Sequence, residues 1–323
     1  MNFDKKNARF LSMLGHRGAF SVSITELAQT IDNLILLTAD LATLTGLERF
    51  RKIYPDKFYN IGIAEQNMIG VAGGLAKDGN VVFATTYANF ITMRSYEQIR
   101  MNLGYMQFNV KLIGTGGGLS MGLSGSSHLG IEDVALMRAI PNMTIISPAD
   151  GNEIAKTIFA AGKHVGPMYI RLTGGMNSPI VYNKDYEFVI GKAITLREGN
   201  DIAIVSTGTM VYESLEAAKE LEKQGLSAQV INMHTIKPLD TDIIDRVLKR
   251  VKLLVTVEEH SVIGGLASAI AEYKSQIQTL VPQLSIGLPD QFVKPGEYSY
   301  LMSKYGLTSE KISRKIVERY SSI

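Results

Sequence analysis

The chain has 323 residues, more than a single hydrophobic core usually serves, which predicts two domains of about 150 residues each. Apolar residues make up 46% of it, charged residues 20%, and the formal net charge is +2, so the composition is that of a globular protein with no electrostatic basis for binding nucleic acid or a membrane. It has no cysteine, which excludes disulfides and thiolate metal sites, and no signal-peptide pattern or apolar run of about 18 residues, so we expect a cytoplasmic protein.

Apolar segments of strand length alternate with segments of helix length over the first half of the chain. Ser23-Ile-Thr-Glu26 has the pattern of a capping box and predicts a helix start. Continuously apolar runs predict buried strands at 34–40, 81–85, 110–114, 143–146 and 168–171. Helices are predicted between them at 96–100, 132–138 and 153–161. This alternation predicts a parallel sheet covered on both faces, with ligand sites at the carboxyl ends of its strands.

The alternation stops between residues 173 and 197, where Gly174-Gly175 and Ser178-Pro179 indicate a connection between domains. A second alternating unit follows, with strands predicted at 201–206, 228–232 and 252–258 and helices at 211–221, 266–273 and 309–320. The sequence therefore predicts two α/β domains, each a mostly parallel sheet covered by helices. We expect them at residues 1–175 and 196–323, with a linker at 176–195.

The segment 58–76 contains a carboxylate that needs an explanation. It turns at Gly62 and enters a helix rich in small residues, with Glu65 in the first turn. An acid at such a position is ordinarily explained by the positive end of the helix. Here the neighbouring side chains are apolar almost all round: Ile61, Ile63, Met68, Ile69 and Val71. We therefore expect Glu65 to be buried and to meet a polar group, since a buried carboxylate without a partner is costly.

Other patterns have ordinary structural explanations. The glycine-rich turn that begins at Gly114 fails as a dinucleotide-binding fingerprint, because the third glycine would fall at Leu119 and no acid follows at the required distance. Tyr87 and Phe90, three residues apart, are typical of an aromatic core pair. The five histidines show no metal-ligand spacing, so we expect no metal ligand on this chain.

Three short segments of the first half carry a family likeness: GIAEQ at 62–66, ATTYANF at 84–90 and Ser127-His128. They resemble the pyrimidine-binding domain of the transketolase and deoxyxylulose-phosphate synthase group of thiamine diphosphate enzymes. In the second half, HTIKPLD at 234–240 and EEHSVIGG at 258–265 resemble the C-terminal domain of the same enzymes. The likeness covers nearly the whole chain.

The resemblance implies roles for individual residues. Glu65 matches the glutamate that hydrogen-bonds the aminopyrimidine ring of thiamine diphosphate and drives the tautomer that deprotonates the thiazolium carbon. Tyr87 and Phe90 match the aromatic wall on which the pyrimidine stacks, and Leu41 the bulky residue that bends the cofactor. His128 matches a catalytic histidine that faces the reacting carbon and can shuttle a proton near neutral pH. The implied cofactor-binding residues are Asp40, Leu41, Glu65, Tyr87 and Phe90.

The chain contains no Gly-Asp-Gly motif. Enzymes of this group hold the diphosphate and Mg²⁺ through that motif, which in a full-length transketolase lies in an N-terminal domain. The resemblance therefore implies the C-terminal half of a split transketolase. Its partner would be an N-terminal subunit that carries Gly-Asp-Gly and most of the Mg²⁺ site, and the expected assembly is an α2β2 heterotetramer.

The chain departs from the family at the sugar-binding positions. Transketolases that bind sugar phosphates have a serine, a histidine and an aspartate where this chain has Leu44, Gly116 and Ser124. Gly116 and Ser124 predict more room at the wall of the substrate channel. Arg171, at the end of its strand, is the cation expected to meet an anionic substrate. The predicted substrate-binding residues are His128, Arg171, Gly116 and Ser124.

We therefore expect the C-terminal subunit of a split transketolase that transfers a two-carbon ketol unit between sugars, with a bulky, nucleotide-linked or otherwise modified acceptor. Two alternatives stay open. The first is a subunit of a decarboxylating thiamine diphosphate enzyme, similar to deoxyxylulose-phosphate synthase or to the β subunit of an oxo-acid dehydrogenase. The second is a non-catalytic assembly partner, against which the intact set of Glu65, aromatic wall and His128 argues.

Overall fold

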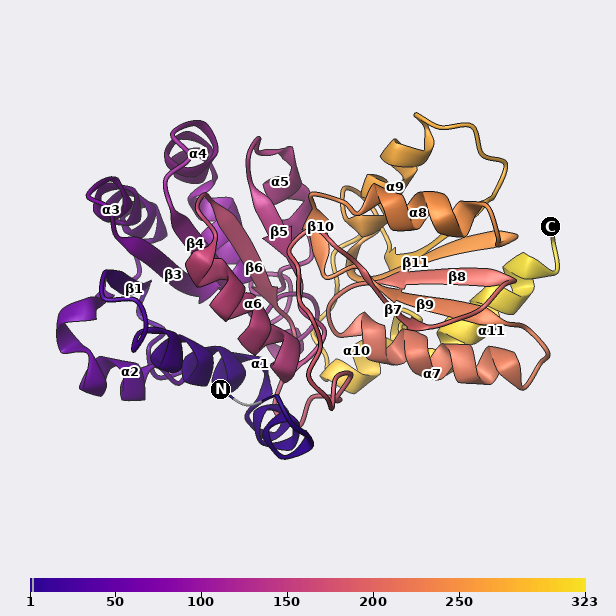
Figure 1. Ribbon diagram of the computed structural model, residues 1–323, viewed down its shortest axis with the longest axis horizontal. Helices are drawn as coiled ribbons and strands as arrows, with labels where there is room; N and C mark the ends of the chain where they lie inside the picture. The colour runs from indigo at the N-terminus through magenta and orange to yellow at the C-terminus, as the bar shows by residue number, and fades with distance from the viewer. Residues whose placement is uncertain (2) are drawn as a thin grey trace.

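The computed structural model describes residues 1 and 3–323 and consists of two α/β units that lie side by side along the longest axis of the molecule (Figure 1). The N-terminal unit is built on a seven-stranded sheet of order β10-β5-β6-β4-β3-β1-β2, and the C-terminal unit on a five-stranded sheet of order β12-β11-β8-β9-β7. β10 pairs antiparallel with β5, and β7 with β9. The other strand pairs within the described residues run parallel, which confirms the predicted fold class.

The strands of the first sheet are short and mostly buried. They are β1 (Leu34–Thr38), β2 (Phe58–Asn60), β3 (Val81–Tyr87), β4 (Val110–Thr115), β5 (Thr144–Ile146), β6 (Met168–Leu172) and β10 (Thr235–Lys237). Every strand predicted from an apolar run in the first half is present, with ends that differ by one or two residues. The prediction missed β2, which has only three residues, and β10, which comes from the second half of the chain and pairs Thr235 with Ile146.

Helices cover both faces of this sheet. α1 (Lys5–Leu27), α2 (Glu48–Ile53) and α6 (Gly151–Lys163) share one apolar cluster, and α3 (Glu65–Lys77), α4 (Tyr96–Ile99) and α5 (Asp133–Ala139) share another. Successive residues of β1 divide between the two, Leu36 in the first cluster and Leu37 in the second. This is the alternation that a strand buried on both faces requires.

The predicted helix start at Ser23 is wrong. α1 begins at Lys5, and the carboxylate of Asp4 caps it by accepting a hydrogen bond from the Asn7 backbone amide at 2.8 Å. Ser23 lies inside the helix, fully buried, and its hydroxyl donates to the Ala19 carbonyl at 2.7 Å. A serine inside a helix can donate a hydrogen bond to the carbonyl four residues earlier, so a capping-box sequence does not always mark a helix start. α1 is interrupted at Gly15, where φ is 70°.

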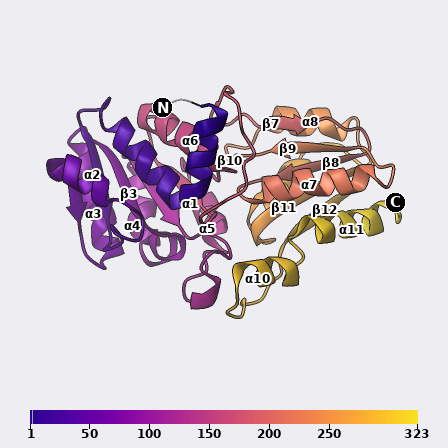
Figure 2. The ribbon, with the colours of Figure 1, turned by 90° about the horizontal axis from the view of Figure 1, so that it is seen from below.

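The C-terminal unit repeats the layered arrangement on a smaller scale. Its strands are β7 (Ile194–Arg197), β8 (Ile202–Ser206), β9 (Ala228–Asn232), β11 (Leu253–Ser261) and β12 (Gln283–Leu288). α7 (Met210–Glu222), α10 (Tyr298–Lys304) and α11 (Ser309–Tyr320) share the cluster on one face, where α7 and α11 lie together (Figure 2). α8 (Thr241–Leu248) and α9 (Leu266–Lys274) share the cluster on the other face.

The segments that carry the predicted site residues follow the carboxyl ends of neighbouring strands. Asp40 follows β1, Glu65 follows β2, Tyr87 ends β3 and Gly116 follows β4. Because β1 to β4 run parallel, these ends lie at one edge of the sheet, where α/β folds bind ligands. No helix among residues 1 and 3–323 is long and apolar enough to cross a bilayer.

Candidate active site

Glu65 is the first residue of α3 and its side chain is only 5% exposed, so the predicted burial is confirmed. The neighbouring apolar residues do not all contribute, since Ile63 is 75% exposed. Glu65 lies on the wall of a cavity of about 490 Å³, a volume suited to part of a small-molecule ligand. The cavity is lined by Ile63, Ala64, Glu65, Gln66, Asn67 and Arg94.

The polar partner of Glu65 is Arg94. Its Nη1 atom lies 3.2 Å from Oε1 and 3.4 Å from Oε2 of the carboxylate. The same guanidinium covers the ring of Phe90, with Cζ 3.8 Å from the ring centre. Phe90 and Arg94 are the two ends of one π-helical turn, η2 (Phe90–Arg94), and such turns frequently occur at functional sites. The sequence analysis missed Arg94, although an arginine four residues after the aromatic wall was a usable signal.

Tyr87, Phe90 and His128 form one aromatic cluster. The ring centres lie 5.7 Å apart for Tyr87 and Phe90, 5.8 Å for Tyr87 and His128, and 5.3 Å for Phe90 and His128, all edge-to-face. His128 Nδ1 lies 2.9 Å from the Ser127 hydroxyl, which orients the imidazole. The Asn89 amide holds this loop in place by donating to the Ser127 carbonyl at 2.7 Å. Three of the residues predicted from the family likeness are therefore in mutual contact.

Asp40 and Leu41 follow β1 at the same sheet edge. Asp40 has φ of 58°, a left-handed conformation that aspartate tolerates better than most residues, and it is exposed. Asn60 connects it to the Glu65 segment, because the Asn60 side chain donates to Asp40 Oδ1 at 3.1 Å and accepts from the backbone amides of Asp40 and Gly62 at 3.0 Å each. The sequence analysis did not single out Asn60. It ties the turn after β1 to the turn before α3.

Arg17 is a second cation at the aromatic cluster that the sequence analysis did not identify. Its Cζ atom lies 5.8 Å from the ring centre of Tyr87, and Nη2 lies 3.0 Å from the sulfur of Met121. Within the described part of the chain, no carboxylate pairs with it. The break at Gly15 directs it there, and the break is fixed because His16 Nδ1 accepts a hydrogen bond from the Gly174 amide at 2.9 Å. Burial lowers the pKa of His16 to about 4, which keeps its ring neutral.

The room expected at Gly116 is occupied. A Cβ atom built on Gly116 would lie 2.8 Å from Met121 Cγ and 3.4 Å from the Tyr87 ring, so the Met121 side chain fills the space that a larger residue would need. Ser124 is exposed at the end of a short 3₁₀ turn, η4 (Gly122–Ser124), and Leu44 is 56% exposed. The predicted extra room in the substrate channel at Gly116 is therefore wrong, because the Met121 side chain fills it.

Arg171 is not placed to meet a substrate. It is 2% exposed, and its Nε atom lies 2.7 Å from Oδ2 of the fully buried Asp133. Its Nη2 atom donates to the carbonyls of Gly130 and Glu259 at 2.8 and 3.0 Å. The contact with Glu259 joins the two α/β units, so Arg171 is a structural cation, contrary to its predicted substrate-binding role.

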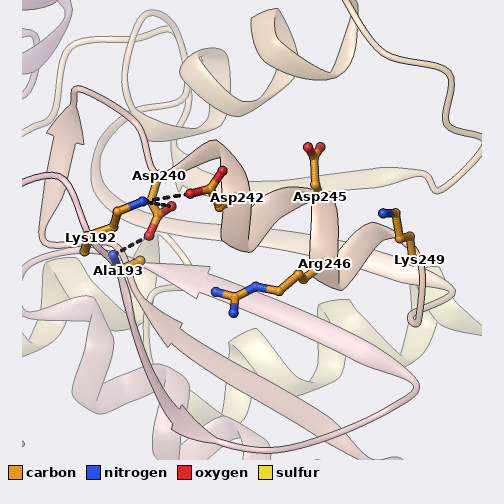
Figure 3. Close-up of a pocket in the computed structure, with 7 residues that line it drawn as sticks. All are labelled: Lys192, Ala193, Asp240, Asp242, Asp245, Arg246 and Lys249. Carbon is orange, nitrogen blue, oxygen red and sulfur yellow. Dashed lines mark hydrogen bonds and ion pairs between the residues drawn. The ribbon is translucent and has the colours of Figure 1, made fainter.

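A larger cavity of about 540 Å³ lies on the C-terminal unit at α8 (Figure 3). Its lining is almost entirely charged, with both signs: Lys192, Ala193, Asp240, Asp242, Asp245, Arg246 and Lys249. Some of these charges are paired with one another, as Lys192 Nζ and Asp242 Oδ2 are at 2.8 Å. None of the predicted site residues lines it, and we take it as a polar surface groove.

Comparison with known proteins identifies the family. Residues 13–176 match the model of the transketolase pyrimidine binding domain, and residues 191–312 match that of the transketolase C-terminal domain. The chain belongs to the transketolase family. It contains the two domains in the order that the sequence predicted. Transketolases are a family of transferases.

Its relatives include split-gene subunits. A putative transketolase C-terminal section from Methanocaldococcus jannaschii is 40% identical over 306 residues, covering 94% of this chain and 96% of the relative. A 6-deoxy-6-sulfo-D-fructose transketolase subunit from Clostridium sp. (strain MSTE9) is 40% identical over 293 residues, 90% of each chain. A solved split-gene transketolase, described as an inactive β4 tetramer, superposes with a TM-score of 0.87 at 38% identity, covering 95% of this chain and 98% of the other.

Proposed function

We propose that this chain is the C-terminal subunit of a split transketolase and that Glu65, Tyr87, Phe90 and His128 form its share of the active site. The observation that carries the proposal is a buried carboxylate beside a cavity and an aromatic cluster, in a chain of the transketolase family. The reaction is transfer of a two-carbon ketol unit from a ketose donor to an aldehyde acceptor.

The described residues fit one end of thiamine diphosphate. Glu65 offers a shielded carboxylate to a ring nitrogen, and the aromatic cluster offers a surface on which a pyrimidine can stack. When bound, thiamine diphosphate supplies the nucleophilic carbon and stabilises the negative charge left when the ketose is cleaved. Glu65 would hold or move the proton at the pyrimidine nitrogen, and Leu41 and Asp40 would pack beside the cofactor.

The residues that bind the diphosphate group of the cofactor and Mg²⁺ would belong to another chain. The sequence has no Gly-Asp-Gly, and in residues 1 and 3–323 no group of three or more acidic, histidine or cysteine side chains could hold a metal. An N-terminal subunit with Gly-Asp-Gly would supply those ligands, and the complete enzyme would be an α2β2 heterotetramer in the cytoplasm. Each active site would then contain residues of both kinds of subunit.

Arg17, rather than Arg171, would be the cation that meets an anionic substrate. In the part of the chain that the structure describes, the Arg17 guanidinium beside the aromatic cluster has no carboxylate partner, which supports a sugar with an anionic group such as a phosphate or a sulfonate. The relative that acts on 6-deoxy-6-sulfo-D-fructose supports a modified sugar. His128, oriented by Ser127, would exchange a proton with the substrate oxygen at the reacting carbon.

Product analysis of the complex reconstituted with its N-terminal subunit tests the proposal. We expect a ketose donor to lose two carbons to an aldehyde acceptor without release of carbon dioxide. Release of carbon dioxide from pyruvate, with no ketol transfer, would instead support the decarboxylating alternative. Equal activity of the N-terminal subunit without this chain would support a non-catalytic partner.

A further inference from the structure

Arg94 is the sole side chain that contacts the Glu65 carboxylate through a hydrogen bond or ion pair within the described residues. One guanidinium group therefore bridges Glu65 and the face of Phe90. A planar ligand that stacked on that face and bonded Glu65 would need the position that this guanidinium occupies. Both groups are flat, and the guanidinium and a pyrimidine protonated at its ring nitrogen each present an N–H donor at the edge, so they offer Glu65 and Phe90 the same kind of contact.

From this overlap we infer that Arg94 and the aminopyrimidine of thiamine diphosphate compete for Glu65 and Phe90, and that Arg94 thereby sets the cofactor affinity of the assembled enzyme. The inference rests on the proposed function. It makes Arg94 a positioning residue that acts through Glu65 and Phe90.

The geometry of the ion pair is that of an exchangeable contact. Its distances of 3.2 and 3.4 Å are longer than the 2.7–2.9 Å typical of a strong charge-assisted hydrogen bond, and the Arg94 side chain is 49% exposed. The buried pair of Arg171 and Asp133 gives the contrast within the same unit, at 2.7 Å with exposures of 2% and 0%. Glu65 is thus held loosely where Asp133 is held tightly.

The backbone of Arg94 is anchored while its side chain is not. The Arg94 carbonyl accepts a hydrogen bond from the Gln66 side chain at 3.0 Å, which fixes the end of η2 against α3. Fully paired arginines lose their side-chain freedom, but a half-exposed one retains alternative rotamers in solvent. Arg94 can therefore leave Glu65 and Phe90 by side-chain rotation, without any change in the helices.

Phe90 packs against the other two rings of the aromatic cluster in edge-to-face contacts. Tyr87 meets it at an interplanar angle of 75° and His128 at 61°. The face of Phe90 that Arg94 covers adjoins Glu65, because the same guanidinium contacts both side chains. Displacement of Arg94 exposes this face without disturbing the other two rings.

Titration calorimetry of thiamine diphosphate, at fixed Mg²⁺, into the complex reconstituted with the N-terminal subunit tests the inference. If Arg94 occupies the site in most molecules, the apparent Kd for thiamine diphosphate equals the intrinsic Kd divided by the fraction of sites that Arg94 leaves free. Arg94→Gln removes this competitor and should lower the Kd by about 3-fold to 10-fold. Arg94→Lys keeps the charge but not the plane and should fall between wild type and Arg94→Gln. Arg314→Gln, which removes an exposed ion pair on α11, should leave the Kd unchanged.

An unchanged or higher Kd for Arg94→Gln would overturn the inference, and a higher Kd would make Arg94 a ligand of the cofactor. If Arg94→Gln does not assemble, the Kd of Arg94→Lys decides in the same way. Failure of the wild-type complex to bind thiamine diphosphate at all would instead refute the proposed function.

Discussion

At the scale of single residues, the proposed chemistry depends on a buried carboxylate. Glu65 is 5% exposed, contacts the Arg94 guanidinium and lines a cavity with it. A carboxylate in this setting can act as a positioned proton-transfer group, because surrounding protein replaces the solvent that would otherwise compete for its hydrogen bonds.

Glu65→Gln should therefore remove catalysis and leave the fold intact. Glutamine keeps the shape and one acceptor oxygen but cannot take up a proton, so we expect turnover of the reconstituted complex to fall by about 10²-fold to 10⁴-fold. The melting temperature and the assembly state serve as controls. Turnover at the wild-type rate would show that the assigned role is wrong.

Arg17→Gln tests the cation at the sugar end. Loss of a charge-assisted hydrogen bond costs about 1.5–3 kcal/mol, so kcat/KM for a sugar with a terminal phosphate or sulfonate should fall by about 10-fold to 100-fold. The Kd for thiamine diphosphate should not change, and Arg17→Lys should recover part of the loss. An equal fall for a neutral sugar would contradict binding of the anionic group by Arg17.

Glu65, Tyr87, Phe90 and His128 could be proposed as site residues from the sequence because each lies in a short local motif. The two cations at the site could not be predicted. Arg94 reaches Glu65 only because η2 brings it back over Phe90, and Arg17 reaches Tyr87 only because α1 breaks at Gly15. Arg171 was misjudged for the same reason, since its partner Asp133 is distant in sequence.

At the scale of elements, the break in α1 is the feature that most directly shapes the site. Gly15 has φ of 70°, and a Cβ atom added there would overlap the carbonyl of Gly175. The break lets His16 bond Gly174 and points Arg17 at the aromatic cluster. A helix that continued through this position could not make both contacts.

Gly15→Ala should destabilise the chain by at least about 1–3 kcal/mol, because the backbone at Gly15, with φ of 70° and ψ of −178°, is essentially confined to glycine and costs an alanine about that much before the overlap with Gly175 is counted. The free energy of unfolding in denaturant measures it. Gly74→Ala, on the exposed side of α3 with open space around it, is the matched control and should be neutral or stabilising by up to about 1 kcal/mol. Equal stabilities of the two variants would show that the break is not required.

Strands were predictable from sequence where they form continuous apolar runs, since burial on both faces leaves no room for polar residues. Helices were predicted less well. In α1 the buried residues include Ser21, Ser23 and Thr25, which hide the apolar periodicity. β10 could not be assigned to the first sheet, because nothing local in 235–237 indicates a partner about 90 residues earlier.

At the scale of the whole molecule, a buried polar network joins the two α/β units. Glu153 of α6 accepts hydrogen bonds from Asn232, at the end of β9, at 2.9 Å to each carboxylate oxygen, and from Tyr186 of the linker at 3.2 Å. Asp150, the cap of α6, accepts from the linker amides of Val181 and Tyr182 at 2.8 and 2.7 Å. Burial raises the pKa of Glu153 to about 7 and that of Asp150 to about 6.

These shifts predict that stability falls as pH rises. A glutamate with a pKa of about 7 in the folded protein and 4.5 when unfolded keeps its proton in the fold, so its contribution is complete below pH 4.5 and is lost as pH rises through 7. For Glu153 the total is of the order of 3 kcal/mol. Glu153→Gln should flatten the decline in unfolding free energy between pH 5 and about 7.5, whereas Glu310→Gln on exposed α11 should not. A decline of unchanged slope in Glu153→Gln would contradict the assignment.

The central claim is that this chain supplies only part of a thiamine diphosphate site. Calorimetric titration of the cofactor with Mg²⁺ into this chain alone, into the N-terminal subunit alone and into their mixture tests it most directly. We predict tight, stoichiometric binding in the mixture and weak binding to either chain by itself, because each alone provides only part of the contacts to the cofactor. Tight stoichiometric binding to this chain alone would contradict the claim.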